Sequence, residues 1–451
     1  MTTALALDDP KKLCQQLADV AQQCVEQARA SGASGAEAGV STSAGLSVTA
    51  RNGEVETIEH IRDKGVGLTV YFGQRKGTAS TSDFSAEAIA DTVEAACQIA
   101  KLTGEDEHSG LADAELMATD FPDLDLYHPW REMSAERAIE LAVETEQAGL
   151  AVDERIVNSD GATLGSHETS HAYVNSHGFV GVRNSTRHSL SCRLIGEDRG
   201  GMQRDYWYDT SRSMDDMDAA ADIGRTAAER TIARLSPGAV NTGQYPVLLP
   251  PEVASGFFGH FVGAIRGGAL YRKATFLLDK LGEQVFSPHI RIHEQPHLLG
   301  AAGSTAYDGE GVATAPRDLI TDGVLQGYVL DSYAARRLGM TTTANAGGVH
   351  NLTIDPGDKD ADELLRDLGT GVLVTDLMGM GINMVTGDYS RGASGFWVEN
   401  GAISHPITEF TIAGNLSNMF KSVVAVGNNV DTRSNIRTGS VLLDGLTVAG
   451  E

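Results

Sequence analysis

The chain has 451 residues and is strongly acidic, with 61 Asp and Glu residues against 35 Lys and Arg residues and a formal net charge of −26. Hydrophobic residues make up 41% of it, which is enough for one or more large buried cores, so intrinsic disorder is excluded as the main state. The negative charge repels nucleic acid and anionic membranes, which bind clusters of Lys and Arg. We therefore expect no nucleic-acid partner and no membrane partner.

The start of the chain, MTTALALDDPKK, lacks the basic and apolar segments of a signal peptide. No apolar run reaches the roughly 18 residues that a membrane-spanning helix needs. The four cysteines are scattered without a CxxC pair, at Cys14, Cys24, Cys97 and Cys192. We predict that they are reduced core thiols in a cytoplasmic protein.

The first hundred residues have the pattern of a helix, an antiparallel meander and a second helix. Apolar residues recur at helical spacing from Asp9 to about Arg29, and again after Ser85. Between these helices, segments with alternating apolar residues flank Asn52-Gly53, a strong signal for a type I′ hairpin.

The same order of elements then appears a second time. A helix is predicted from Ser134, strands follow with turns at Asp160-Gly161 and His177-Gly178, and a further helix is predicted over 213–235. The residues hardly repeat while the elements do. We interpret this as an internal helix-meander-helix repeat.

The breaker Ser236-Pro237-Gly238 predicts a domain boundary, which gives an N-terminal α+β domain over 1–236 and a C-terminal domain over 237–451. In the second domain a short strand is predicted over 244–249, and Pro250-Pro251 is typical of a helix start. Beyond Gly282 the chain is glycine-rich and is expected to be mostly strand-like. The predicted fold class is α+β, with antiparallel sheets and helices first and a β-rich domain after them.

One group of histidines has spacing that invites a metal-site hypothesis: His289, His293 and His297. Pro288 and Pro296 exclude a regular helix here, and four residues of extended chain span about 13 Å, too far for two ligands of one metal. We expect surface or rim histidines and keep the group as an alternative site.

A run of acidic residues among glycines follows, with no EF-hand spacing. Turn and solvation roles are the favoured interpretation for its members, which are Asp308, Glu310, Asp318, Asp322 and Asp331.

Three long segments resemble the TldD/PmbA (TldE) family of bacterial peptidase subunits: YPVLLPPEVASGFFGHFVGAI, YDGEGVATAPRDLITDGVLQGYVLDSYAARRLGMTTTANAGG and GFWVENGAISHPITEFTIAGNL. The resemblance runs over essentially the whole chain and is greatest to the PmbA/TldE branch. It implies a cytoplasmic complex of a TldD-type and a TldE-type subunit. Such complexes trim ribosomally made peptides such as microcin precursors and degrade an antitoxin.

The TldD branch of this family carries zinc through HExxxH on a helix and a cysteine near the C-terminus, and this sequence departs from that pattern. Pro251 stands where the first histidine is expected, Glu252 matches the glutamate, and Gly256 stands at the second histidine. The last cysteine in the chain is Cys192. Because a catalytic zinc normally needs three protein ligands, we expect no cofactor in this chain and interpret Glu252 as a remnant of the family's general base.

The leading hypothesis is therefore a metal-free subunit that pairs with a zinc-bearing TldD-type subunit and helps to enclose unfolded peptides. One alternative is a hydrolase in its own right, with His289, His293 and His297 joined by Asp308 or Glu310 from a neighbouring loop. Another alternative is a peptide-binding homodimer without turnover. The resemblance also implies a dimer, and a homodimer is expected for the chain in isolation.

Overall fold

The computed structural model describes residues 9–131 and 134–450, and their first half folds as two helix-meander-helix units. The first unit contains α1 (Pro10–Ala30), β1 (Gly35–Arg51), β2 (Glu54–Phe72), β3 (Arg75–Thr81) and α2 (Ala86–Leu102). The second contains α3 (Ala135–Leu150), β4 (Ile156–Asn175), β5 (Val180–Asp198), β6 (Gly201–Ser211) and α4 (Ala220–Ala233). The predicted internal repeat is confirmed.

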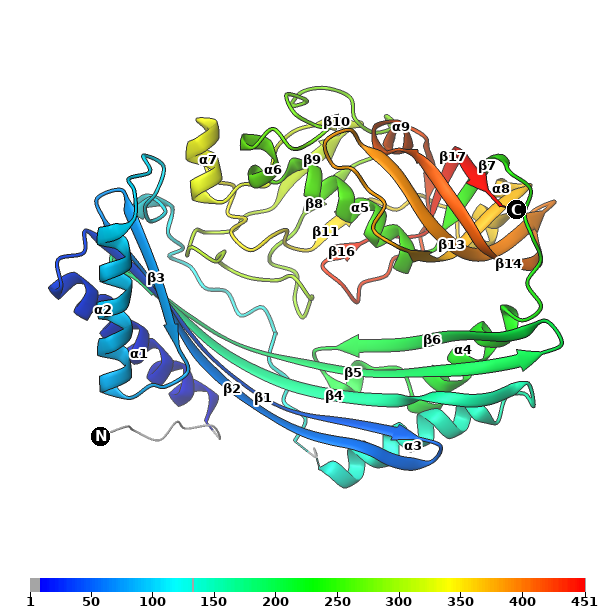
Figure 1. Ribbon diagram of the computed structural model, residues 1–451, viewed down its shortest axis with the longest axis horizontal. Coiled ribbons are helices and arrows are strands. Elements are labelled where there is room, and N and C mark those ends of the chain that lie inside the picture. The colour runs from blue at the N-terminus through cyan, green and yellow to red at the C-terminus, as the bar shows by residue number, and fades with distance from the viewer. Residues whose placement is uncertain (1–8, 132–133, 451) are drawn as a thin grey trace.

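The two meanders join into one six-stranded antiparallel sheet with the order β3-β2-β1-β4-β5-β6. Buried residues alternate along β1 and fall on one face, where α1 and α2 cover one end and α3 and α4 cover the other. The sheet is long and curved, and the C-terminal half lies on its concave side (Figure 1). The opposite, polar face of the sheet therefore meets the C-terminal half.

Two of the three predicted turns are present as hairpins between neighbouring strands. Asn52 and Gly53 have φ angles of 55° and 76°, and positive values at both residues are what a type I′ turn requires. The buried Glu146 carboxylate accepts hydrogen bonds from both backbone N–H groups, at 2.9 and 2.7 Å, which ties α3 to this hairpin. The second turn, at His177-Gly178, joins β4 to β5.

The predicted turn at Asp160-Gly161 is wrong, because both residues lie inside β4. The pairing of β4 with β5 shifts register between Ser159 and Gly161, so the signal marks a β-bulge. Gly161 has a φ of 103°, which explains the glycine at the bulge.

The helix predicted over 213–235 is shorter than expected. The Ser213 hydroxyl accepts from the N–H of Asp215 and caps only a 3₁₀ turn over Met214–Asp216. Met217 is extended, with φ −82° and ψ 148°, so the chain leaves the helical conformation before α4 begins at Ala220.

The C-terminal half begins with β7 (Gly243–Leu249) and α5 (Pro251–Ile265), as the sequence predicts, with Pro250 at the N-cap. The remaining helices are α6 (Gly267–Tyr271), α7 (Ser332–Leu338), α8 (Ala361–Leu368) and α9 (Leu416–Lys421). The remaining strands are β8 (Ile292–Glu294), β9 (Arg317–Thr321), β10 (Val324–Leu325), β11 (Leu352–Ile354), β12 (Gly371–Met378), β13 (Asp388–Glu399), β14 (Ala402–Asn415), β15 (Val423–Val426), β16 (Ile436–Arg437) and β17 (Val441–Ala449).

These strands form a five-stranded sheet, β10-β9-β8-β11-β16, and a six-stranded sheet, β14-β13-β12-β7-β17-β15. The α+β fold class is confirmed. The expectation of mostly strand-like structure beyond Gly282 is wrong for residues 282–350, where short strands and α7 interrupt irregular chain. The division of the chain at residue 236 stays a prediction.

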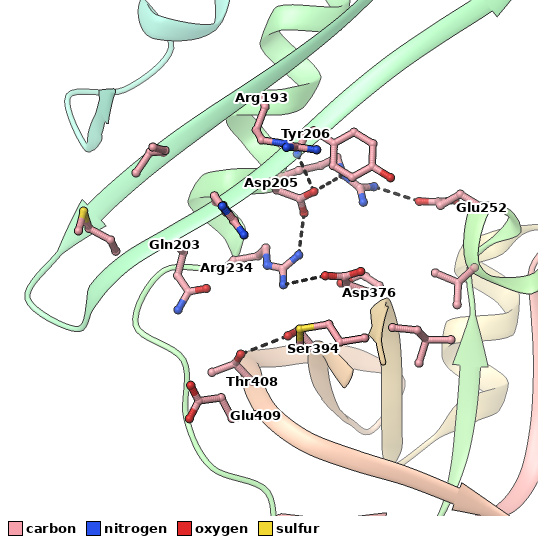
Figure 2. A pocket seen from close by; sticks show the side chains of 18 of the residues that line it. Arg193, Gln203, Asp205, Tyr206, Arg234, Glu252, Asp376, Ser394, Thr408 and Glu409 are labelled. Atoms are coloured by element: carbon pink, nitrogen blue, oxygen red, sulfur yellow. Dashed lines mark hydrogen bonds and ion pairs between the residues drawn. The ribbon is translucent and has the colours of Figure 1, made fainter. Parts of the chain in front are cut away.

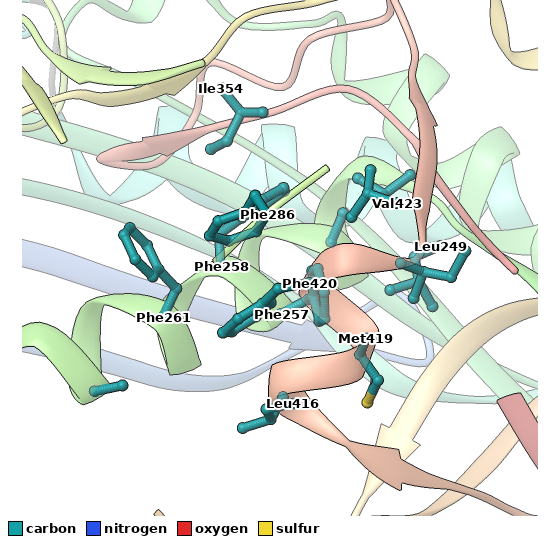
Figure 3. Packing of buried hydrophobic residues seen from close by; sticks show 14 of the residues in the cluster. Leu249, Phe257, Phe258, Phe261, Phe286, Ile354, Leu416, Met419, Phe420 and Val423 are labelled. Carbon is teal, nitrogen blue, oxygen red and sulfur yellow. The ribbon is translucent and has the colours of Figure 1, made fainter. Parts of the chain in front are cut away.

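An aromatic cluster fixes α5 in the core of the C-terminal half (Figure 3). Phe257, Phe258 and Phe261 face Phe286 and Phe420, and the rings of Phe286 and Phe420 stack with centroids 4.6 Å apart. Because such interiors are close-packed, the first turn of α5 has a defined position.

The prediction of core thiols is confirmed: all four cysteines are buried and unpaired, at Cys14, Cys24, Cys97 and Cys192. None of the helices over 9–131 and 134–450 combines the length and the apolar character required to span a lipid bilayer.

Candidate functional site

The first turn of α5 lies at a cleft of about 870 Å³ between the curved sheet and the C-terminal half (Figure 2). One wall is built by β5, β6 and α4, and the other by α5 and by β12, β13 and β14. The cleft therefore joins residues that are more than 200 positions apart in the sequence, such as Arg193 and Glu409.

Glu252 lies in the first turn of α5 and is neutralised by an arginine from α4. The Arg230 Nη1 donates to Glu252 Oε1 at 3.1 Å, and the two side chains are only 23% and 19% exposed. A carboxylate at this position is also favoured by the helix dipole. Glu252 thus has a structural partner in this chain.

Arg230 belongs to an ionic network that crosses the cleft (Figure 2). Its Nε lies 3.6 Å from Asp205 Oδ1, while Arg234 Nη1 lies 3.3 Å from Asp205 Oδ2. Arg234 Nη2 is 4.0 Å from Asp376 Oδ2 on β12. The Arg230 guanidinium also stacks over the ring of Trp207, 4.9 Å from its centroid. The network connects β6 and α4 to both α5 and β12.

The residues that the family resemblance places at zinc positions, Pro251 and Gly256, do not fit a metal ion. Pro251 and Gly256 carry no side-chain ligand, and a Cβ added at Gly256 would meet no atom within 4 Å. Among the described residues, no group of three His, Cys, Asp or Glu side chains could hold a metal ion. The cation that Glu252 contacts is the guanidinium of Arg230.

The three histidines of the alternative site are not brought together as a metal-binding group. His289 and His297 are exposed, and the His297 Nε2 pairs with the Thr314 hydroxyl at 3.0 Å. His293 lies on β8 and is only 7% exposed, so the expectation of a surface or rim histidine is wrong for it. Burial lowers the pKa of His293.

Two members of the acidic run, Asp308 and Glu310, are largely buried beside a second cavity of about 580 Å³. The Asp308 carboxylate accepts from the N–H groups of Glu310, Val312 and Ala346, which confirms its predicted role in a turn. Glu310 accepts from the N–H of Ser332, and burial raises the pKa of Glu310 to about 7. The predicted solvation role is wrong for Asp308, which is buried in the structure, because residues distant in sequence cover it.

The arginines of the cleft were missed in the sequence. Arg230 and Arg234 are four positions apart near the end of a helical segment, so a shared face could have been noticed. Their partners Asp205, Glu252 and Asp376 come from three other elements, and no sequence spacing links them.

A curved antiparallel sheet with helices on one face and a second β-rich half on the other defines an α+β protein with a cleft between its two halves. Three models of one protein family match the sequence of the chain. They are "PmbA/TldA metallopeptidase domain 1" over 36–100, the central domain over 128–235 and the C-terminal domain over 242–450. The chain belongs to the PmbA/TldA metallopeptidase family, as its resemblance to the PmbA/TldE branch predicted.

Individual relatives agree with this assignment. The chain is 51% identical to metalloprotease PmbA of Escherichia coli O157:H7 over 417 residues, which cover 92% of each chain. A solved structure from Bacteroides thetaiotaomicron, whose name refers to modulation of DNA gyrase, is 30% identical with a TM-score of 0.91 and covers 96% of this chain and 98% of its own. TldE from Thermococcus kodakarensis shares the fold, with 20% identity, a TM-score of 0.85 and coverage of 96% and 100%.

Proposed function

We propose that this chain is the metal-free PmbA/TldE-type subunit of a peptidase complex in which a TldD-type subunit carries the catalytic zinc. One observation carries the proposal: Glu252 is paired with Arg230, while Pro251 and Gly256 supply no metal ligand. A carboxylate held by a guanidinium is not free to act as general base for a metal-bound water. Cleavage of the peptide bond is then assigned to the TldD-type partner.

In this proposal the subunit helps to enclose unfolded peptides in a cytoplasmic heterodimer. The substrates are the family's peptide precursors of the microcin type and an antitoxin. The curved sheet and the cleft between the two halves of the chain support an enclosing role, because an extended peptide fits where a folded domain does not.

The test is reconstitution of the purified chain with a TldD-type subunit and an unfolded precursor peptide. We expect cleavage by the mixture, loss of cleavage with a zinc chelator, and no cleavage by this chain alone. Cleavage by the TldD-type subunit alone at the rate of the mixture would overturn the proposal. Size-exclusion chromatography of the mixture supplies an independent readout, because a heterodimer should replace any homodimer of the isolated chain.

A further inference from the structure

Three buried hydrogen-bonding atoms of residues that line the cleft lack the hydrogen-bond partners that such atoms usually have. Across residues 9–131 and 134–450, seven buried side-chain atoms have no hydrogen-bond partner, and three of them belong to residues that line this cleft. They are Arg230 Nε, Thr375 Oγ1 and Arg391 Nε. Arg230 Nε has Asp205 at 3.6 Å as an ionic partner, whereas the buried Thr375 Oγ1 on β12 and Arg391 Nε on β13 have no partner among the described residues, and both residues line the cleft. Unpaired buried donors are uncommon and costly, so a ligand with acceptor atoms is expected.

The charges around the cleft favour an anion as that ligand. Arg193, Arg204 and Arg391 line the cleft, and within the described part of the chain they form no ion pair. The lining also contains four acidic residues. Three of them, Asp205, Glu252 and Asp376, form ion pairs with Arg230 or Arg234. Glu409 forms no ion pair within the described residues. The lining as a whole carries five arginines against four carboxylates, a net charge of +1, in a chain with a net charge of −26. Such a local field attracts anions.

The wall of the cleft that β12, β13 and β14 form also carries uncharged hydroxyl groups near Arg391. Thr375 lies at the β-bulge of β12, where the pairing with β13 shifts register between Val374 and Asp376. Ser394 and Thr408 lie on the adjacent strands, with their hydroxyl oxygens 3.2 Å apart. Arg391 is held in place by Nη2, which donates to the carbonyl of Leu377 at 2.9 Å. A guanidinium is a typical partner of a carboxylate, and a hydroxyl group can donate one further hydrogen bond to it.

We propose that this cleft binds a carboxylate group of an extended peptide, with Arg391 and Thr375 as the anchoring donors and Arg193 and Arg204 as attracting charges on the facing wall. The choice of a peptide rests on the proposed function, whereas the carboxylate follows from the unpaired donors and charges. The role is peptide retention beside Glu252, with no bond made or broken by this chain. The carboxylate can come from a peptide C-terminus or from an acidic side chain.

Isothermal titration calorimetry on the full chain tests the site, with an N-acetylated hexapeptide of Ala, Ser and Leu as the probe. The peptide is compared as the free acid, as the C-terminal amide, and as the amide with one internal Glu. We expect at least one carboxylate-bearing form to bind about tenfold more tightly than the neutral amide, equivalent to about 1.4 kcal/mol. The form that gains affinity identifies the source of the carboxylate. Equal affinity of all three peptides, or no binding, would overturn the inference.

Substitutions then locate the site. Arg391→Gln should remove the advantage of the carboxylate, Arg391→Lys should restore part of it, and Thr375→Val should weaken it about threefold through loss of one hydrogen bond. Arg225→Gln is the matched control, because Arg225 lies on the exposed side of α4 and pairs with Asp222. If Arg391→Gln fails to fold, Thr375→Val and the acid-amide comparison on the unaltered chain still decide. Retention of the full advantage in both Arg391→Gln and Thr375→Val would place the carboxylate elsewhere and overturn the proposal.

This binding assay is independent of the reconstitution described above. A carboxylate preference can be present in the isolated chain even if the TldD-type subunit needs no partner, and it can be absent from a chain that is essential for cleavage. The two failures are therefore distinguishable.

Discussion

The Arg230 guanidinium donates to the Glu252 carboxylate over 3.1 Å, and this contact joins α4 of the first half of the chain to α5 of the second half. Both groups are mostly shielded from water, which strengthens their attraction. The resemblance to the TldD/PmbA family predicts that Glu252 corresponds to a glutamate of the zinc site in the TldD branch. Here a side-chain cation neutralises it, so the position links the two halves of the molecule.

The contribution of this ion pair can be measured by a double-mutant cycle. We expect Arg230→Ala to lower the free energy of unfolding by about 2 kcal/mol, because it leaves both Glu252 and Asp205 with less compensation. Glu252→Ala should cost about 1 kcal/mol, and the coupling energy should be about 1 kcal/mol. Urea denaturation of the two single variants and the double variant gives these values. Additive effects would show that the pair is energetically neutral, and Arg225→Ala provides the exposed control.

The second prediction concerns the metal content of the purified chain. Because Pro251 and Gly256 offer no ligand atoms, we expect zinc well below one ion per chain by mass spectrometry. Addition of a chelator should leave the thermal unfolding midpoint unchanged, since a bound structural metal would otherwise stabilise the fold. One tightly held zinc per chain, removed together with a drop in the midpoint, would contradict the assignment of this subunit as metal-free.

Glu310 should make the stability of the chain depend on pH in a defined direction. Its pKa is about 7 in the folded chain against 4.5 ordinarily, so the folded state holds this proton more tightly than the unfolded state. The stability that this proton provides is fully present below about pH 4.5 and is lost as the pH rises through 7. The difference of about 2.5 pH units corresponds to roughly 3 kcal/mol as an upper value.

Glu310→Gln keeps an acceptor for the N–H of Ser332 but removes the titration. We therefore expect the variant to gain stability relative to the unaltered chain between pH 5 and pH 8, measured by denaturant unfolding at both values. Parallel stability curves for the two proteins would show that Glu310 ionises normally.

The aromatic core around α5 gives a prediction of packing energy. Phe258 is fully buried against Phe257 and Phe286, so Phe258→Ala should cost about 3–5 kcal/mol through lost burial and a residual cavity. Phe121→Ala is the control, because Phe121 is 47% exposed and should cost about 1 kcal/mol. Thermal and urea unfolding test both values. Equal costs would indicate that the core around Phe258 repacks.

Local sequence patterns determined the elements whose causes lie within a few residues. Pro250-Pro251 predicted the start of α5 because proline suits the first helical turn, and Asn52-Gly53 predicted a hairpin because both residues adopt positive φ. The residue types at 251 and 256, which the resemblance places at the family's zinc ligands, led to the prediction that these ligands are absent. Predictions from patterns that fit two structures were wrong. Asp160-Gly161 is compatible with a β-bulge as well as with a turn, and a serine such as Ser213 can cap a 3₁₀ turn as well as an α-helix.

Only the tertiary structure decided what surrounds Glu252 and what the cleft can bind. Arg230, Asp205 and Asp376 come from α4, β6 and β12, and their contacts depend on how the C-terminal half sits against the curved sheet. Burial has the same origin, since the raised pKa of Glu310 and the unpaired donor of Arg391 arise from chain segments distant in sequence. The sequence by itself determined the repeat and the fold class, because these depend on residue type and local spacing. Charge pairing and desolvation depend on three-dimensional neighbours, so the fold alone determined them.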